Sequence, residues 1–110
     1  MIDNIPLKSF NSNAQLKFDE QGKLAVFLNG QKIRILLDQS FSNYKNRSLK
    51  FQNGSLNIYG YEGKNNDNRY ALPLSTANGV WPLSLILENN GDIQIYDNGF
   101  NVIKTIKRFE

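Results

Sequence analysis

The chain has 110 residues, of which 40% are hydrophobic and 12% aromatic, so it can bury the core of one domain but not of two. It contains no cysteine and no histidine, which excludes disulfides, Cys or His metal sites, thiol nucleophiles and His general bases. Its net charge of +3 comes from basic residues scattered among acidic ones, a balance that indicates ordinary solubility and only a weak preference for an anionic partner.

The N-terminal segment carries Asp3 and Pro6 and lacks the apolar stretch of a secretory signal. No apolar run approaches the roughly 20 residues that a membrane-spanning helix needs. We therefore expect a soluble protein without a membrane span. It would be made in the cytoplasm and then remain there, associate with a particle or leave the cell without Sec export.

The first predicted element is a β-hairpin over residues 16–27. Its turn contains Gln21-Gly22, where a tight hairpin needs a residue that tolerates positive φ. A third strand is predicted over residues 32–37, after a turn at Asn29-Gly30. The spacing of two along the hairpin puts four apolar side chains on one face: Leu16, Phe18, Leu24 and Val26.

Two further hairpins repeat this order of residue types, over residues 49–59 and 85–96. Their turns contain Asn53-Gly54 and Asn90-Gly91, and Asn-Gly is the strongest short hairpin signal. Third strands are predicted over residues 69–74 and 101–107. The apolar faces consist of Leu49, Phe51, Leu56 and Ile58 in one hairpin, and of Leu85, Leu87, Ile93 and Ile95 in the other.

The three segments therefore form an internal repeat, with copy one over about residues 12–38, copy two over 45–76 and copy three over 81–107. No long segment has a helical period with capping residues. Three short sheets with one apolar face each can bury those faces only against one another. We predict a single all-β domain over residues 1–110, a three-fold pseudo-symmetric β-prism of three antiparallel sheets. The alternative is three unrelated hairpins in a β-sandwich.

Copy three also resembles the bulb-type (monocot) mannose-binding lectins, whose signature Gln-x-Asp-x-Asn-x-Val-x-Tyr follows an apolar-x-apolar lead. Residues 85–97 match this order most closely, and the resemblance extends over about residues 12–107. It implies a β-prism of three four-stranded sheets. It also implies sugar binding, in which the polar signature residues hydrogen-bond the hydroxyls and the Val contacts the sugar ring.

Carried onto copy three, the signature places Glu88 for the Gln, Asn90 for the Asp and Asp92 for the Asn, while Gln94 replaces the Val and Tyr96 matches. Glu88 loses the amide donor, and Asn90 and Asp92 exchange donor and acceptor roles. Gln94 replaces an apolar contact with an amide. The resemblance therefore implies a sugar site on copy three without fixing mannose specificity.

The other two copies depart further from the signature. Copy two offers Gln52, Asn57 and Tyr59, but it is one residue shorter, which we expect to displace Asn53 and Ser55 from the site. Copy one carries a cation and lacks the tyrosine hydroxyl, because its residues at these positions are Asp19, Gln21, Lys23, Ala25 and Phe27.

Three other features of the sequence each have a simpler interpretation beside the functional one. Asp19, Glu20 and Asp97 are interpreted as turn or surface acids, because nothing in the sequence places two carboxyls across a glycosidase cleft. Trp81 is either a core residue, as a Trp beside Pro more often is, or a stacking platform. A nucleic-acid surface could be built from Lys45, Arg47, Lys50 and Tyr44, although a solvated loop and strand face is the simpler interpretation.

The C-terminal segment over residues 101–110 alternates like a strand and must find a partner strand. In the lectin family this strand is often exchanged between two protomers, which implies a homo-oligomer. Pairing within its own chain is the alternative.

The sequence thus favours a non-catalytic carbohydrate-binding module for mannose-type glycans, with no cofactor and no metal. The alternative function is a structural or protein-interaction subunit of a larger assembly, such as a virion or a secretion-type machine, that keeps the β-prism without sugar binding. This alternative is motivated by signatures that are degraded in every copy while the core positions are kept.

Overall fold

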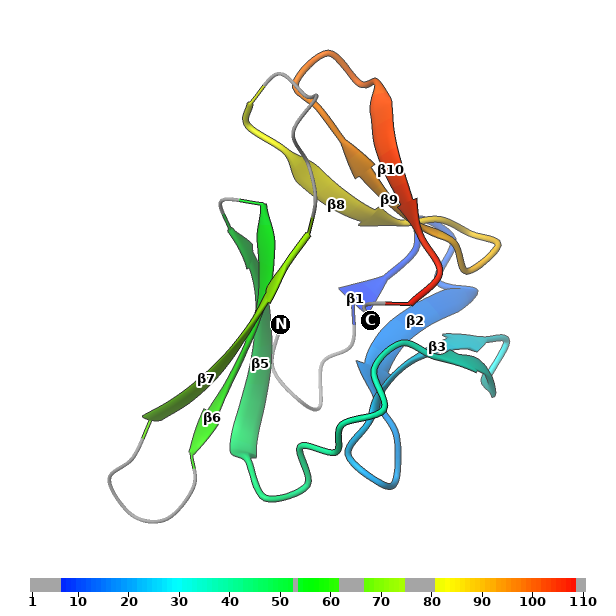
Figure 1. Cartoon of the computed structure of the whole chain (residues 1–110). Coiled ribbons are helices and arrows are strands. Elements are labelled where there is room, and N and C mark those ends of the chain that lie inside the picture. The colour runs from blue at the N-terminus through cyan, green and yellow to red at the C-terminus, as the bar shows by residue number, and fades with distance from the viewer. Residues whose placement is uncertain (1–6, 53, 62–66, 75–80, 109–110) are drawn as a thin grey trace.

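A computed structural model describes residues 7–52, 54–61, 67–74 and 81–108 of the chain. Within these ranges the protein contains ten β-strands and no helix, in three antiparallel sheets (Figure 1). The predicted all-β prism-like fold is confirmed, because each sheet contains the three strands of one copy of the repeat, with one short strand added to the first sheet from the residues before copy one. The strands follow one another along the chain, and no sheet takes a strand from another copy.

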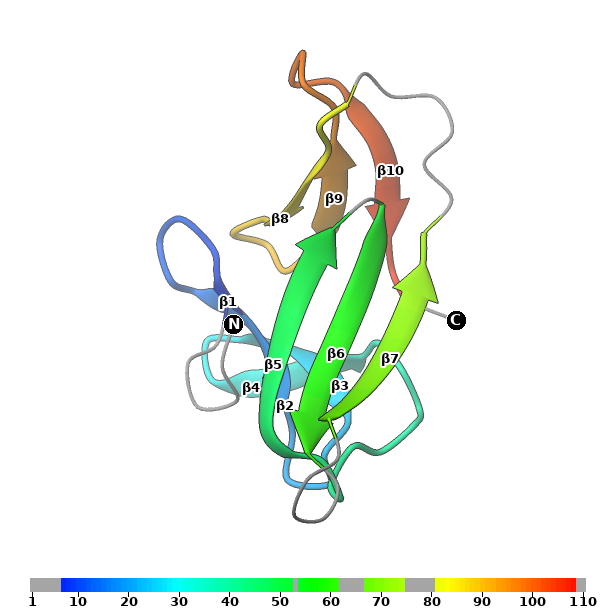
Figure 2. The ribbon, with the colours of Figure 1, turned by 90° about the vertical axis from the view of Figure 1, so that its left-hand side faces the viewer.

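Sheet one has the strand order β1-β2-β3-β4 and consists of β1 (Leu7–Lys8), β2 (Ala14–Phe18), β3 (Leu24–Leu28) and β4 (Gln31–Ile35). Sheet two has the order β5-β6-β7 and consists of β5 (Lys45–Gln52), β6 (Ser55–Tyr61) and β7 (Asp67–Pro73) (Figure 2). Sheet three has the order β10-β9-β8 and consists of β8 (Ser84–Leu87), β9 (Ile93–Tyr96) and β10 (Val102–Ile106).

The number of strands per sheet differs from the family resemblance. Three four-stranded sheets were expected from it, but only sheet one has four described strands, and sheets two and three have three each. The fourth strand of sheet one, β1, was not predicted. It is two residues long, with Leu7 opposite Leu16 and Lys8 opposite Gln15, too short to leave an alternating pattern in the sequence.

The hairpin turns form where the glycines predicted them. Gly22, Gly54 and Gly91 have φ of 78°, 75° and 92°, a backbone conformation that residues with a Cβ rarely adopt. In copy one the Gly22 N–H donates to Asp19 O at 3.0 Å, and in copy three the Gly91 N–H donates to Glu88 O at the same distance. Copy two closes with a tighter turn, because Gln52 pairs directly with Ser55. Asn53 lies outside the described residues.

The core lies between the inward faces of the three sheets, as the alternation predicted. Phe51 and Leu85 are half-buried and pack against this core. The other predicted core residues are buried: Leu16, Phe18, Leu24, Val26, Leu49, Leu56, Ile58, Leu87, Ile93 and Ile95.

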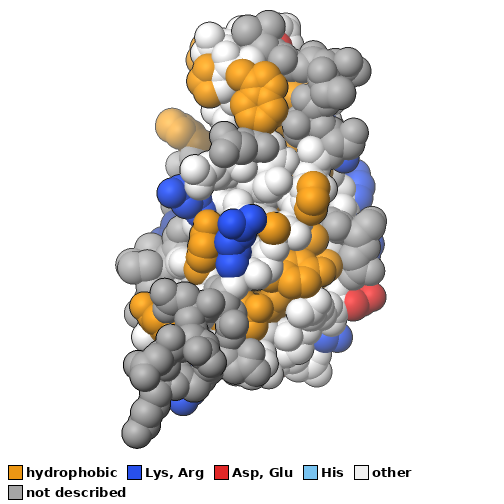
Figure 3. Space-filling model, turned by 60° about the vertical axis from the view of Figure 1, so that its left-hand side comes forward, with side chains coloured by type: hydrophobic (Ala, Val, Ile, Leu, Met, Phe, Trp, Pro, Cys, Tyr) orange, Lys and Arg blue, Asp and Glu red, His pale blue; other side chains and the backbone are white. Residues whose placement is uncertain are grey.

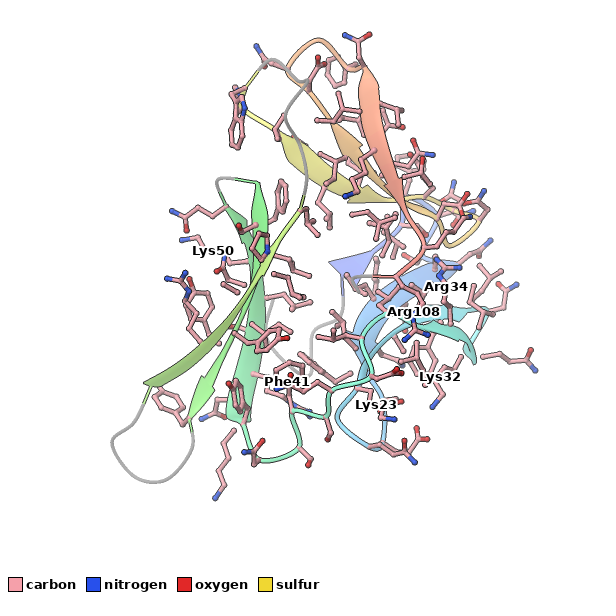
Figure 4. All side chains as sticks on the ribbon, viewed as in Figure 1. Lys23, Lys32, Arg34, Phe41, Lys50 and Arg108 are labelled. Atoms are coloured by element: carbon pink, nitrogen blue, oxygen red, sulfur yellow. The ribbon has the colours of Figure 1, made fainter. Side chains whose placement is uncertain are left out.

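A residue from the connection between β4 and β5 completes the core. Phe41 is fully buried and lies between sheets one and two (Figure 4). Its ring makes edge contacts with Tyr44 and Tyr70, at centroid distances of 5.2 and 5.3 Å, and with Phe18 at 6.2 Å. This single aromatic side chain therefore joins two copies of the repeat.

The C-terminal strand finds its partner within the chain, because β10 pairs antiparallel with β9. Of the two alternatives, the structure shows pairing within the chain, and a homo-oligomer stays a prediction. None of the described residues forms a helix that is long and apolar enough to cross a membrane.

Candidate functional site

The outward face of sheet three carries the five candidate residues of copy three, and the structure joins four of them in two pairs. Tyr96 Oη donates a hydrogen bond to Glu88 Oε1 at 2.7 Å. This bond, with the negative charge of Glu88, raises the pKa of Tyr96. The residues at the first and last positions of the signature, Glu88 and Tyr96, therefore lie side by side, but they are already hydrogen-bonded to each other.

The second pair lies in the turn between β8 and β9. The Asp92 N–H donates to Asn90 Oδ1 at 3.0 Å, and Asn90 Nδ2 donates to Asp92 Oδ2 at 3.2 Å. Lys107 Nζ donates to Asp92 Oδ1 at 3.0 Å, which lowers the pKa of Asp92. Gln94 lies between the two pairs, half-buried, with Ile86 and Thr105 opposite it. A ligand on this face would have to displace these internal bonds.

The equivalent face of copy one is closed. The Asp19 side chain is fully buried; its Oδ1 accepts the backbone N–H groups of Gln21 and Lys23, and Lys32 Nζ lies 2.9 Å from its Oδ2. Burial raises the pKa of Asp19, but the bonds from Lys23, Lys32 and Gln21 outweigh it, so the pKa lies below its ordinary value. This confirms that Asp19 is a turn acid.

Phe27, which stands at the tyrosine position of copy one, is covered by a side chain of the protein itself. Lys17 Nζ lies 4.5 Å from the centroid of the Phe27 ring, a cation–π contact. Ala25 beside it is fully buried. Copy one therefore offers neither a free ring nor a free hydroxyl to a sugar.

Copy two has a hollow of about 210 Å³ on the outward face of sheet two, open to solvent. Its walls come from the end of β5, from β6 and from β7: Gln52, Ser55, Asn57, Tyr59 and Arg69. The period-two alternation of β6 points Ser55, Asn57 and Tyr59 outward while Leu56 and Ile58 enter the core. All three candidate residues of copy two thus meet in one site.

Most polar groups of this hollow are not engaged with one another. Asn57 Nδ2 makes only long contacts with backbone oxygens, 3.3 Å to Ser55 and 3.4 Å to Lys50, and no described donor binds its Oδ1. No described hydrogen bond or ion pair uses the Arg69 guanidinium, which is exposed. Figure 3 looks onto this side of the molecule, where Lys and Arg side chains lie beside hydrophobic ones and the described acidic side chains lie at the margins.

Two residues of the hollow, Ser55 and Arg69, were not predicted from the sequence to be part of the site. Ser55 was expected to be displaced by the shorter turn, and this was wrong, because the Gln52–Ser55 pair closes the tighter turn without shifting the strands. Arg69 was predicted only as part of a strand. The signal that places it in the hollow is the register of β6 and β7, in which Arg69 lies opposite Tyr59.

The structure also tests the interpretations of Trp81 and of the basic cluster. Trp81 is 50% exposed, so its interpretation as a core residue is wrong. Of the basic cluster, Arg47 lies over the Phe18 ring at 4.5 Å and Tyr44 packs against Phe41, so both are structural. The other two residues of the cluster, Lys45 and Lys50, are exposed on β5, and in Figure 4 Lys50 points away from the core.

Within the described ranges, no cluster of acidic side chains has the composition of a metal site. No protein-family model, curated protein or solved structure matches this chain significantly. The bulb-lectin resemblance therefore stays a prediction, and the activity has to be argued from the geometry of the hollow.

Proposed function

We propose that this protein is a non-catalytic carbohydrate-binding module that binds a mannose-type glycan through the hollow of sheet two. One observation carries the proposal: an aromatic ring, two amides, a hydroxyl and a guanidinium converge on a solvent-open hollow of about 210 Å³. Sugars present many hydroxyls and little apolar area, so they need several convergent donors and acceptors beside an apolar surface.

Each residue of the hollow has a role in this proposal. Gln52 is exposed and offers an amide oxygen and nitrogen, which can bond two neighbouring hydroxyls at once. Asn57 is buried at the base of the hollow and has its Nδ2 directed at backbone oxygens, so it offers its Oδ1 as an acceptor. Ser55 adds a hydroxyl, and the Tyr59 ring adds an apolar surface for the C–H groups of the sugar ring. The site is shallow, so the affinity of one site is weak, with dissociation constants near the millimolar range, and useful avidity requires several sites.

Copy three is the second place where a glycan would bind, through Glu88, Asn90, Asp92, Gln94 and Tyr96. Glu88, Asn90, Asp92 and Tyr96 already hydrogen-bond one another or Lys107. A glycan that binds there must break these bonds, so its binding releases less free energy. This difference makes the hollow of copy two the preferred site.

The test is a titration of the isotope-labelled protein with methyl α-mannopyranoside, followed by amide shifts. We expect shifts that saturate at roughly 10 mM sugar and cluster on β5, β6 and β7. The double variant Gln52→Ala/Tyr59→Ala removes an amide and the ring and should weaken binding about tenfold, whereas the matched pair Asn90→Ala/Tyr96→Ala should change it less than about threefold. Absence of binding at that concentration contradicts the proposal.

The alternative function, an interaction subunit of a larger assembly, is favoured by a different observation. Phe10 and Phe100 lie in the turns before β2 and before β10 and are 99% and 83% exposed. Exposed aromatic side chains are typical of protein-binding surfaces. A stable oligomer or a bound protein that is lost in Phe10→Ser/Phe100→Ser, without any glycan binding, would favour this alternative.

A further inference from the structure

The residue that lies opposite the aromatic residue near the end of the second hairpin strand differs in charge among the three copies. In sheet one Lys32 lies opposite Phe27, in sheet two Arg69 lies opposite Tyr59, and in sheet three Val102 lies opposite Tyr96. The position is cationic in copies one and two and neutral in copy three.

A second set of equivalent positions lies where the first hairpin strand of each copy meets its turn. Asp19, Gln52 and Glu88 each follow a β-residue whose partner is on the next strand: Phe18, Phe51 and Leu87. This position carries a carboxylate in copies one and three but a neutral amide in copy two.

The two sets together distinguish copy two from the others. In copy one the cation and the carboxylate form the Lys32–Asp19 ion pair at 2.9 Å. In copy three the carboxylate has no cation at the equivalent position, and Glu88 accepts the Tyr96 hydroxyl instead. Copy two keeps the cation, Arg69, and has lost the carboxylate, because Gln52 stands in its place.

Arg69 therefore stands at the position of Lys32 in copy one, but the carboxylate that pairs with Lys32 there is replaced by the neutral Gln52 in copy two. Its side chain lines the hollow beside Gln52, and no described side chain forms an ion pair with it. The planar guanidinium binds a carboxylate through two parallel hydrogen bonds, a geometry that a neutral hydroxyl cannot match. Lys50, outward on β5 and opposite Asn57, adds positive charge on the same face.

We propose that the hollow of copy two selects a sugar that carries a carboxylate, a uronic acid, over the neutral sugar of the same stereochemistry. The ligand's carboxylate would pair with Arg69, as Asp19 pairs with Lys32 in copy one. The hydroxyls would then bind Gln52, Ser55 and Asn57. This inference rests on the proposed carbohydrate-binding function and adds the charge class of the ligand.

The test compares methyl α-mannopyranoside with methyl α-mannopyranosiduronate, which differ only in the group at the sugar's exocyclic carbon. Sodium acetate serves as a third probe, because it carries the carboxylate without the sugar. The dissociation constants are measured by amide shifts at low and at physiological ionic strength. We expect the uronate to bind roughly threefold to tenfold tighter than the neutral sugar, and this advantage to shrink with added salt.

Two variants connect this preference to the residues. Arg69→Gln removes the cation, and Gln52→Glu supplies the carboxylate that copy one has, so that Arg69 is paired within the protein. Both should bring uronate binding down to the level of the neutral sugar. Lys8→Gln, on β1 of another sheet, removes the same charge and should leave the uronate advantage unchanged.

The outcomes separate the inference from the function on which it rests. Equal binding of the two sugars, or tighter binding of the neutral one, leaves the lectin function standing and overturns the carboxylate preference. A uronate advantage that survives both Arg69→Gln and Gln52→Glu also overturns it. If neither sugar binds, the function itself fails, and if acetate shifts the same amides as strongly as the uronate, the hollow is an anion site and not a sugar site.

Discussion

Lys32 Nζ lies 2.9 Å from Oδ2 of Asp19, whose side chain is fully buried beneath the turn between β2 and β3. The other carboxylate oxygen accepts two backbone N–H groups of that turn. One side chain thus performs two tasks, because it organises the turn and neutralises Lys32 of β4, a strand that does not pair with β2. The two tasks can be separated by substitution.

Asp19→Ala should lower the free energy of unfolding by about 1 to 3 kcal/mol, since two turn N–H groups lose their acceptor. Asp19→Asn keeps an acceptor and loses only the charge, so it should cost less. The folded pKa lies below the ordinary 3.8, so the carboxylate's contribution is present above that value and is lost as the pH falls through the folded pKa. Chemical denaturation between pH 7 and pH 2 should show a flatter acid limb in both variants.

Gly22→Ala should be more destabilising than Gly30→Ala, although both glycines have positive φ, 78° and 83°. A Cβ at Gly22 would lie 2.6 Å from the backbone N of Ser42, whereas a Cβ at Gly30 would meet nothing within 4 Å. Gly30→Ala therefore measures the backbone strain alone, about 1 kcal/mol. A melting temperature that falls equally in both variants would contradict the close approach of the turn to residue 42.

Phe41→Ala should cost about 3 to 5 kcal/mol, because it removes a fully buried ring that contacts Phe18, Tyr44 and Tyr70. Phe10→Ala is the matched control, since that ring is 99% exposed, and it should change stability by less than about 0.5 kcal/mol. Denaturant unfolding followed by tryptophan fluorescence measures both. A small effect at Phe41 would mean that the connection is not part of the cooperative core.

Glu88→Gln should lower the pKa of Tyr96 toward the ordinary value of 10.0, because the hydrogen bond to the Glu88 carboxylate and its charge keep that pKa raised. The raised pKa favours the neutral phenol, so this contribution to stability is present below the unfolded pKa and is lost as the pH rises through the folded one. NMR of ring-labelled tyrosine measures the titration. Glu20→Gln, on sheet one, is the control and should leave the Tyr96 titration unchanged.

The features that the sequence predicted correctly depend on residues close together in the chain. Gly22, Gly54 and Gly91 mark the hairpin turns, and alternation across each turn separates the core face from the outward face. Together they determine three sheets with one apolar face each, and burying those faces leaves few other arrangements.

The features that the sequence did not predict depend on contacts between distant segments. Phe41 has no periodic pattern around it and enters the core only because β2 and β7 come together around the connection. Arg69 lines the hollow because of the register of β6 and β7. The alternation of apolar and polar residues along one strand shows which face each residue occupies, but it does not show which residue of the next strand lies opposite. The Trp81 interpretation followed what is common for tryptophan, whereas this tryptophan lies at the surface.

Because every sheet consists of strands that follow one another along the chain, its hydrogen bonds can form by local zipping of hairpins. The steps that involve large sequence separations are the contacts between sheets, such as that of Phe41 with Tyr70. The entropic cost of closing long loops therefore falls on the docking of the sheets and not on the formation of any single sheet. This favours a high folding rate for an all-β chain. In a folding-rate analysis, substitutions in the hairpin turns would then slow refolding, whereas truncation of Phe41 would mainly speed unfolding.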